Sequence, residues 1–171
     1  MLYFVRHGQS QANLDKTFAG GQIDSPLTNR GREQAVNTAK VILDSGITFD
    51  KIISSPMSRA FETAQIIQSC LGDIEIVTDE RMAEYDMGSL SGQSYSVMKT
   101  DTFVPVHDGE NPDMLKERVL SFLEEVRKQQ KNILVVSHGF VFRMIKTIKN
   151  DSDIDSFYRL SDLENAELAQ I

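Results

Sequence analysis

The feature that most constrains the fold of this chain is an alternation of short apolar runs with longer amphipathic segments. The runs are rich in β-branched or aromatic residues, as strands are, and lie at 2–5, 51–54, 74–78 and 132–137. The amphipathic segments lie at 28–44, 56–71, 112–130 and 140–149, with a weaker one near 152–162. Such alternation predicts an α/β fold with three layers, α/β/α, around a mostly parallel central sheet.

Local signals predict where three of the helices start. Ser55-Pro56 and Asn111-Pro112 each place a capping side chain before a proline, which suits the first helical position, and Thr28 can cap the helix that follows it. These signals support helices that begin at or near residues 29, 56 and 112.

Length and pattern together predict a single domain over residues 1–171, because no internal repeat, low-complexity tract or composition shift divides the chain. Residues of about 85–111 lack regular periodicity and read as an irregular excursion from the sheet. The last residues, 166–171, are expected to form a final strand at an edge of the sheet.

Composition excludes several classes of partner. The formal net charge of −7 argues against a nucleic-acid or anionic-membrane surface, which needs clustered lysine and arginine, so an anion site must be local. No apolar run approaches a membrane span and no leader segment is recognisable, so a cytoplasmic location is expected.

The one cysteine, Cys70, cannot form an internal disulfide and is expected to be buried.

Polar residues with distinctive chemistry follow the predicted strands. Arg6 and His7 follow the first run, Arg59 lies about one turn into the helix after the second, and His138 and Gly139 follow the fourth. Ligands of open α/β sheets bind beyond the carboxyl ends of the strands. We therefore expect these residues to converge on one edge of the sheet.

A phosphoryl group is the ligand that suits this set of residues best. Arginine presents a planar fork of donors that matches phosphate oxygens, and helix N-termini near Pro56 and Phe140 would add backbone N–H groups. A neutral histidine can accept a phosphoryl group covalently, so one of the two histidines would attack and the other would stabilise the transition state. Glu84, after the third run, is a candidate acid for the leaving alcohol.

Five ordered segments resemble a known family. They are "VRHGQSQAN" (5–13), "LTNRGREQA" (27–35), "ISSPMSRAFETAQ" (53–65), "EYDMGSLSG" (84–92) and "LVVSHGFVFRMI" (134–145). In this order they resemble the signatures of the histidine phosphatase superfamily, also called the phosphoglycerate mutase-like family, across nearly the whole chain. The resemblance implies the phosphoglycerate mutase-like fold.

The resemblance also implies a role for each matching position. It makes His7 the nucleophile that becomes phosphohistidine, and Glu84 the proton donor and then the base that activates water. The positions that would bind the phosphoryl group are Arg6, Asn13, Arg59, His138 and Gly139. No metal and no cofactor are implied.

The pocket wall is expected to come from the less regular segments. By position alone, its candidate residues are Phe18, Gly20, Gln22, Tyr85 and Met87. His107 lies in the excursion with no paired cysteine or histidine nearby, so a surface position or the pocket mouth is expected for it rather than a metal site.

Hydrolysis and phosphoryl transfer back to a substrate share the same phosphohistidine, so the motifs leave both open. The excursion favours a phosphatase, because its only basic side chain apart from His107 is Lys99, which leaves little to hold a second phosphate. The predicted partner is a small phosphomonoester of unspecified identity. A phosphoglycerate mutase and a non-catalytic phosphate or phosphopeptide binder on the same fold are the alternatives, and no oligomeric state is predicted.

Overall fold

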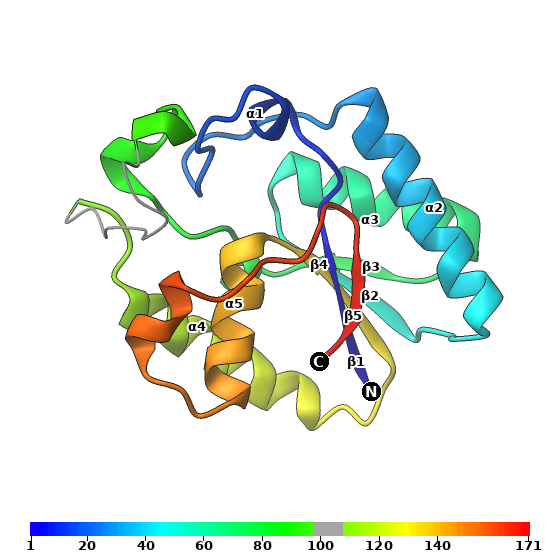
Figure 1. The fold of residues 1–171 in the computed structure, drawn as a ribbon. Coiled ribbons are helices and arrows are strands. Elements are labelled where there is room, and N and C mark those ends of the chain that lie inside the picture. Colours follow the sequence, from blue (N-terminus) through cyan, green and yellow to red (C-terminus); the bar gives the residue numbers. More distant parts are fainter. Residues whose placement is uncertain (98–107) are drawn as a thin grey trace.

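The computed structural model describes residues 1–97 and 108–171, which form a five-stranded sheet flanked by helices (Figure 1). The strand order is β3-β2-β4-β1-β5. The strands are β1 (Leu2–Arg6), β2 (Lys51–Ser54), β3 (Ile76–Thr78), β4 (Ile133–Ser137) and β5 (Leu168–Gln170). The first four are parallel and β5 runs antiparallel to β1, which confirms the mostly parallel sheet and the final edge strand.

The helices cover both faces of the sheet, as the three-layer prediction required. On one face α2 (Asn29–Ser45) and α3 (Ser58–Leu71) pack over the side chains of Val5 and Val136. On the other face α4 (Pro112–Arg127) and α5 (Gly139–Lys149) pack over Phe4 and Val135. Strands β1 and β4 are therefore buried on both sides, which is why their sequences are apolar without alternation.

The register of β1 against β4 brings the two distant His-Gly pairs together. Val5 pairs with Val136 and Arg6 with Ser137. The ladder continues one step further, because the His7 N–H donates to the Ser137 carbonyl at 2.9 Å. As a result His7 and His138 leave the same edge of the sheet side by side.

Two of the three predicted helix starts are confirmed. Thr28 caps α2 by accepting from the Gly31 N–H, and Asn111 caps α4 by accepting from the Asp113 N–H. The Ser55-Pro56 prediction is wrong, because α3 begins at Ser58.

A distant carboxylate takes the place of the predicted cap on α3. Asp24 accepts hydrogen bonds from the Ser58 N–H and from the Ser58 hydroxyl, at 2.8–3.1 Å. Ser55 contacts a histidine instead. The start of α3 is therefore not an open anion-binding end, contrary to the expectation for a helix beginning near Pro56.

Some further elements differ from the prediction. The weak helical segment is a short 3₁₀ helix, Ile154–Tyr158, and a one-turn helix α1 (Gln11–Leu14) was not predicted. Cys70 is exposed rather than buried, because Leu71 is the residue that packs against the core at this end of α3.

Candidate active site

A cavity of about 450 Å³ lies beyond the carboxyl ends of the parallel strands. It extends from the ends of β1 and β4 to the segment that follows α5. Its lining residues are Arg6, His7, Ser10, Asn13, Phe18, Ala19, Gly20, Arg59, Glu84, Met87, Tyr95, Gly139, Phe140, Arg143, Tyr158, Arg159, Leu160 and Asp162. The volume suits a small organic ligand rather than a bare ion.

His7 is buried and held in one tautomer. Its Nδ1 lies 2.7 Å from the Gly8 carbonyl oxygen, an acceptor only, so Nδ1 carries the proton. Its Nε2 therefore presents a lone pair, which accepts a hydrogen bond from Arg59 Nε at 3.3 Å. Burial, Arg59 and Arg6 together hold the pKa of His7 well below its usual value, so the ring is neutral at neutral pH.

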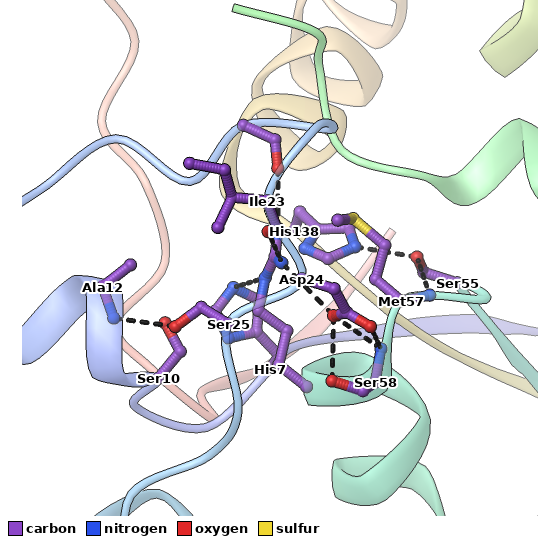
Figure 2. Close-up of polar contacts among 12 residues, drawn as sticks. His7, Ser10, Ala12, Ile23, Asp24, Ser25, Ser55, Met57, Ser58 and His138 are labelled. Carbon is purple, nitrogen blue, oxygen red and sulfur yellow. Dashed lines mark hydrogen bonds and ion pairs between the residues drawn. The ribbon is translucent and has the colours of Figure 1, made fainter. Parts of the chain in front are cut away.

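The guanidinium of Arg59 is buried and fixed by the 20–24 loop. It donates to the carbonyls of Gly20 and Ile23 at 3.0 and 3.1 Å. Asp24 lies 3.9 Å from the same guanidinium and also fastens the loop to the first turn of α3, as Figure 2 shows. The loop therefore sets the position of this cation over His7.

His138 is fully buried and lies beside His7, with the two ring centroids 5.1 Å apart. Its Nε2 is 2.8 Å from the Ser55 hydroxyl, which itself accepts from the Met57 N–H (Figure 2). We assign the Ser55 hydroxyl as the donor to His138 Nε2, which places the ring proton on Nδ1. Burial first, and then Arg59, lower the pKa of His138 well below its usual value.

Two donors at this site have no hydrogen-bond acceptor among the described residues. They are His138 Nδ1 and Arg6 Nε, both buried. The other end of Arg6 is fixed, since its NH1 donates to the Leu163 carbonyl at 2.7 Å and lies 3.7 Å from Asp162. Buried polar groups are normally paired, so these two atoms mark a place for an acceptor-rich ligand.

Glu84 lies in the same cavity, partly buried, with one carboxylate oxygen accepting from the Tyr85 N–H at 2.9 Å. Burial raises the pKa of Glu84 above its usual value, and the nearby Asp162 raises it further. The Tyr85 N–H and Arg59 act in the opposite direction without cancelling the shift. A carboxyl with a raised pKa beside a neutral histidine can hold a proton for transfer.

The loop after β1 is held by residues that follow α5. Asn13 Oδ1 accepts from the Ser10 N–H and from Asn165 Nδ2, at 3.1 and 3.2 Å. Asn165 Nδ2 also donates to the His7 carbonyl at 3.0 Å. These bonds tie the backbone of His7 to Asn13, which lines the cavity, through one side chain from the C-terminal segment.

Gly139 begins α5 at the cavity wall, and its lack of a side chain is required there. A Cβ at this position would lie 2.8 Å from both carboxylate oxygens of Asp162. Asp162 is held in turn by Arg143, whose Nε and NH2 donate to it at 2.8 and 3.0 Å. The wall beside Gly139 is therefore a charged pair, Arg143 with Asp162.

The structure brings together most of the residues that the sequence singled out. Those that line the cavity are Arg6, His7, Asn13, Phe18, Gly20, Arg59, Glu84, Met87 and Gly139, with His138 beside them. Gln22 is exposed and does not line the cavity. Tyr85 is buried and does not line it either, and its ring lies 5.5 Å from the ring of Phe140, which does. The lining of the cavity therefore gives no support to either of these two wall predictions. His107 and Lys99 lie outside the described residues.

Sequence reasoning missed several residues of the site. Those are Tyr95, Arg143, Arg159, Asp162 and Asn165. Only Arg143 carried a local signal, since it lies four residues after Gly139 and thus on the same helical face.

The described residues offer neither a cluster of metal-binding side chains nor a membrane-spanning helix. No cluster of three or more histidine, cysteine, aspartate or glutamate side chains there has the arrangement to hold a metal ion. No helix in the same residues is long and apolar enough to span a bilayer.

Comparison with known sequences gives the class of protein that this fold and site define. The family model of the histidine phosphatase superfamily, branch 1, matches residues 2–171. A protein of Hydrogenobacter thermophilus named as a candidate phosphoserine phosphatase is 32% identical, over 99% of this chain and 88% of its own length. A 2,3-bisphosphoglycerate-dependent phosphoglycerate mutase of Parvibaculum lavamentivorans is 34% identical, over 85% of this chain and 77% of its own length.

Solved structures agree in fold. A phosphoserine phosphatase from Entamoeba histolytica, in complex with 3-phosphoglyceric acid, superposes with a TM-score of 0.83 at 27% identity, covering 98% of this chain and 87% of its own. Bacillus stearothermophilus YhfR gives a TM-score of 0.85 at 25% identity, over 98% and 88%. The chain belongs to the histidine phosphatase superfamily.

Proposed function

We propose that this protein is a phosphomonoester hydrolase that acts on a small phosphorylated metabolite through a phosphohistidine at His7. The observation that carries the proposal is the pairing of a neutral, tautomer-fixed nucleophile, His7, with buried unpartnered donors on Arg6 and His138. A non-catalytic phosphate binder has no need of a nucleophile or of an acid such as Glu84.

In the first step the lone pair of His7 Nε2 attacks phosphorus and the ester P–O bond breaks. The proton that the leaving alkoxide requires comes from the Glu84 carboxyl, so the alcohol departs neutral. Arg6, Arg59 and His138 Nδ1 donate to the equatorial oxygens, where charge is spread in the transition state. The Nδ1–H bond from His7 to the Gly8 carbonyl supports the positive charge that develops on the ring.

In the second step Glu84, now a carboxylate, takes a proton from water as the water oxygen attacks phosphorus. The P–N bond to His7 breaks and inorganic phosphate leaves, which restores neutral His7 and protonated Glu84. Asn13 and the N-terminal backbone of α5 at Gly139 supply further donors to the phosphoryl oxygens. All of these groups belong to the chain itself, so we expect turnover without an added metal ion.

A phosphoglycerate mutase is the second candidate function, favoured by the likeness to the Parvibaculum lavamentivorans enzyme. A mutase returns the phosphoryl group to a bound phosphoglycerate instead of water. The four arginines among the described lining residues leave few cations for a bisphosphate once a phosphoryl group and Asp162 are accommodated. Hydrolysis is for that reason the favoured outcome.

The test is to incubate the protein with p-nitrophenyl phosphate in the presence of EDTA. In parallel, 3-phosphoglycerate is supplied with and without 2,3-bisphosphoglycerate. Nitrophenol release and phosphate formation support a hydrolase, whereas isomerisation without net phosphate release supports a mutase. Absence of both reactions would leave only a phosphate binder.

The second part of the test concerns the nucleophile. His7→Ala should abolish turnover, and the wild type quenched in alkali during turnover should carry an acid-labile phosphoryl group that the variant lacks. Arg30→Ala, on the exposed surface of α2, is the matched control and should keep both signals. Retained turnover in His7→Ala would show that the nucleophile is misassigned.

A further inference from the structure

Arg159 is a cation of the cavity that the proposed mechanism does not use. It lines the same cavity as His7 and Arg59, immediately after the 3₁₀ helix Ile154–Tyr158. Its guanidinium makes no hydrogen bond or ion pair with any residue that the structure describes. No carboxylate whose side chain the structure describes therefore competes for it.

The other three arginines of the described lining already have assigned acceptors. Arg143 is engaged by Asp162 through two of its N–H donors, on Nε and NH2. Arg6 and Arg59 lie beside the histidines, where the proposed function places the phosphoryl group. Among the described lining residues, Arg159 is thus the arginine left for a second group of the ligand.

The backbone that carries Arg159 is firmly supported. The Arg159 N–H donates to the Ser156 carbonyl at 2.9 Å. Phe157 and Tyr158, just before it, are buried, and the Phe157 ring packs 5.4 Å from the ring of Phe140 at the start of α5. The backbone at Arg159 is therefore held in place beside the start of α5, and its exposed guanidinium extends from this fixed point along the cavity.

We propose that Arg159 binds a carboxylate of the substrate, so that the enzyme prefers phosphomonoesters of small carboxylic acids. This inference rests on the proposed function. A guanidinium presents a planar fork that pairs with both oxygens of a carboxylate. One singly charged group matches one unpaired guanidinium, whereas a second phosphate, being a dianion, would call for more cations than the described lining offers. Elsewhere on the wall the rings of Phe18 and Tyr95 pack together, with their centroids 4.6 Å apart, and the cavity volume of about 450 Å³ suits a small acid.

The test compares two probes that differ only in the group concerned. In 3-phosphoglycerate a carboxylate stands where glycerol 3-phosphate has a hydroxymethyl group. The ratio of kcat/KM for the first over the second is measured in the wild type, Arg159→Gln, Arg159→Lys and the control Arg30→Gln. We expect the wild type to prefer 3-phosphoglycerate. In Arg159→Gln the ratio should fall about tenfold, which is the usual effect of losing a hydrogen bond to a charged group. Arg159→Lys should lose less, and Arg30→Gln none.

Binding to the same probes makes the test independent of turnover. Dissociation constants measured by calorimetry should show the same selective loss in Arg159→Gln. If the wild type binds both probes but hydrolyses neither, the proposed function fails while the subsite is still decided by these constants. An unchanged ratio in Arg159→Gln, or an equal loss for both probes, would overturn the assignment of Arg159. The assignment would also be overturned if Arg159→Gln lowered only the ratio of kcat/KM for fructose 1,6-bisphosphate over that for fructose 6-phosphate. That result would indicate that Arg159 binds a second phosphate instead of a carboxylate.

Discussion

Replacing Ser55 with alanine should weaken catalysis through His138 without touching the phosphoryl group. Ser55 and His138 are both fully buried, and the 2.8 Å bond between Oγ and Nε2 is the one hydrogen bond that the His138 ring makes with a described residue. A buried polar atom deprived of its partner costs about 1–3 kcal/mol. We therefore expect the melting temperature to fall by about 2–12 °C.

The effect on catalysis follows from the tautomer. Without the Ser55 hydroxyl proton, no described residue favours the form of His138 that carries its proton on Nδ1. That form is the one that can donate to a phosphoryl oxygen. If the same free energy is lost from the transition state, kcat/KM for p-nitrophenyl phosphate should fall between about 5-fold and about 150-fold. The ¹⁵N shifts of the His138 ring should move toward those of the other tautomer.

Ser54→Ala is the matched control for this experiment. Ser54 is the last residue of β2, directly before Ser55, and is equally buried. Its hydroxyl donates to the Ser55 carbonyl at 2.8 Å and makes no hydrogen bond to a described histidine. It should lose about 0.5–1.5 kcal/mol of stability with little change in kcat/KM or in the His138 shifts. Wild-type kcat/KM in Ser55→Ala, or equal losses in the two variants, would refute the tautomer argument.

Other perturbations have equally definite outcomes. The pH profile of kcat/KM should be bell-shaped. Its acid limb lies well below pH 6.5, because the pKa of His7 is lowered. Its alkaline limb reflects deprotonation of Glu84, whose pKa is raised. Asp162→Asn removes a charge that raises the Glu84 pKa, so the alkaline limb should move to lower pH; a shift to higher pH would contradict this. Glu84→Gln should slow an alkyl phosphate by about 100-fold or more but p-nitrophenyl phosphate much less, since nitrophenolate leaves without a proton; equal losses would rule out the acid role. Gly31→Ala places a Cβ against the backbone of the loop after Gly8 and should cost about 1–3 kcal/mol in chemical denaturation, and an unchanged midpoint would show that this loop yields.

Most of the fold could be predicted from local sequence patterns. The apolar runs and the caps at Thr28 and Asn111 predict strands and helices within a few residues, because both depend on neighbours in the sequence. The start of α3 could not be predicted in this way. Its cap is Asp24, a residue 34 positions away from Ser58, and no local signal announces such a partner.

The candidate site divides in the same way. The sequence by itself determined that Arg6, His7, Arg59, Glu84 and His138 would gather at one edge, because parallel strands deliver their ends to the same side of a sheet. Only the tertiary structure decided which way the irregular segments face, and so removed Gln22 and Tyr85 from the wall.

The tertiary structure also decided what holds the cluster in place. Asn165 reaches the His7 carbonyl across 158 residues, and Asp162 reaches Arg6 and Gly139 from the same C-terminal segment. The helical periodicity of this segment is weak up to residue 162 and does not extend to Asn165. Its place over the cavity comes from burial of Phe157 and Tyr158 in the core, where the Phe157 ring packs against the ring of Tyr85. This is a long-range contact that sequence period does not encode.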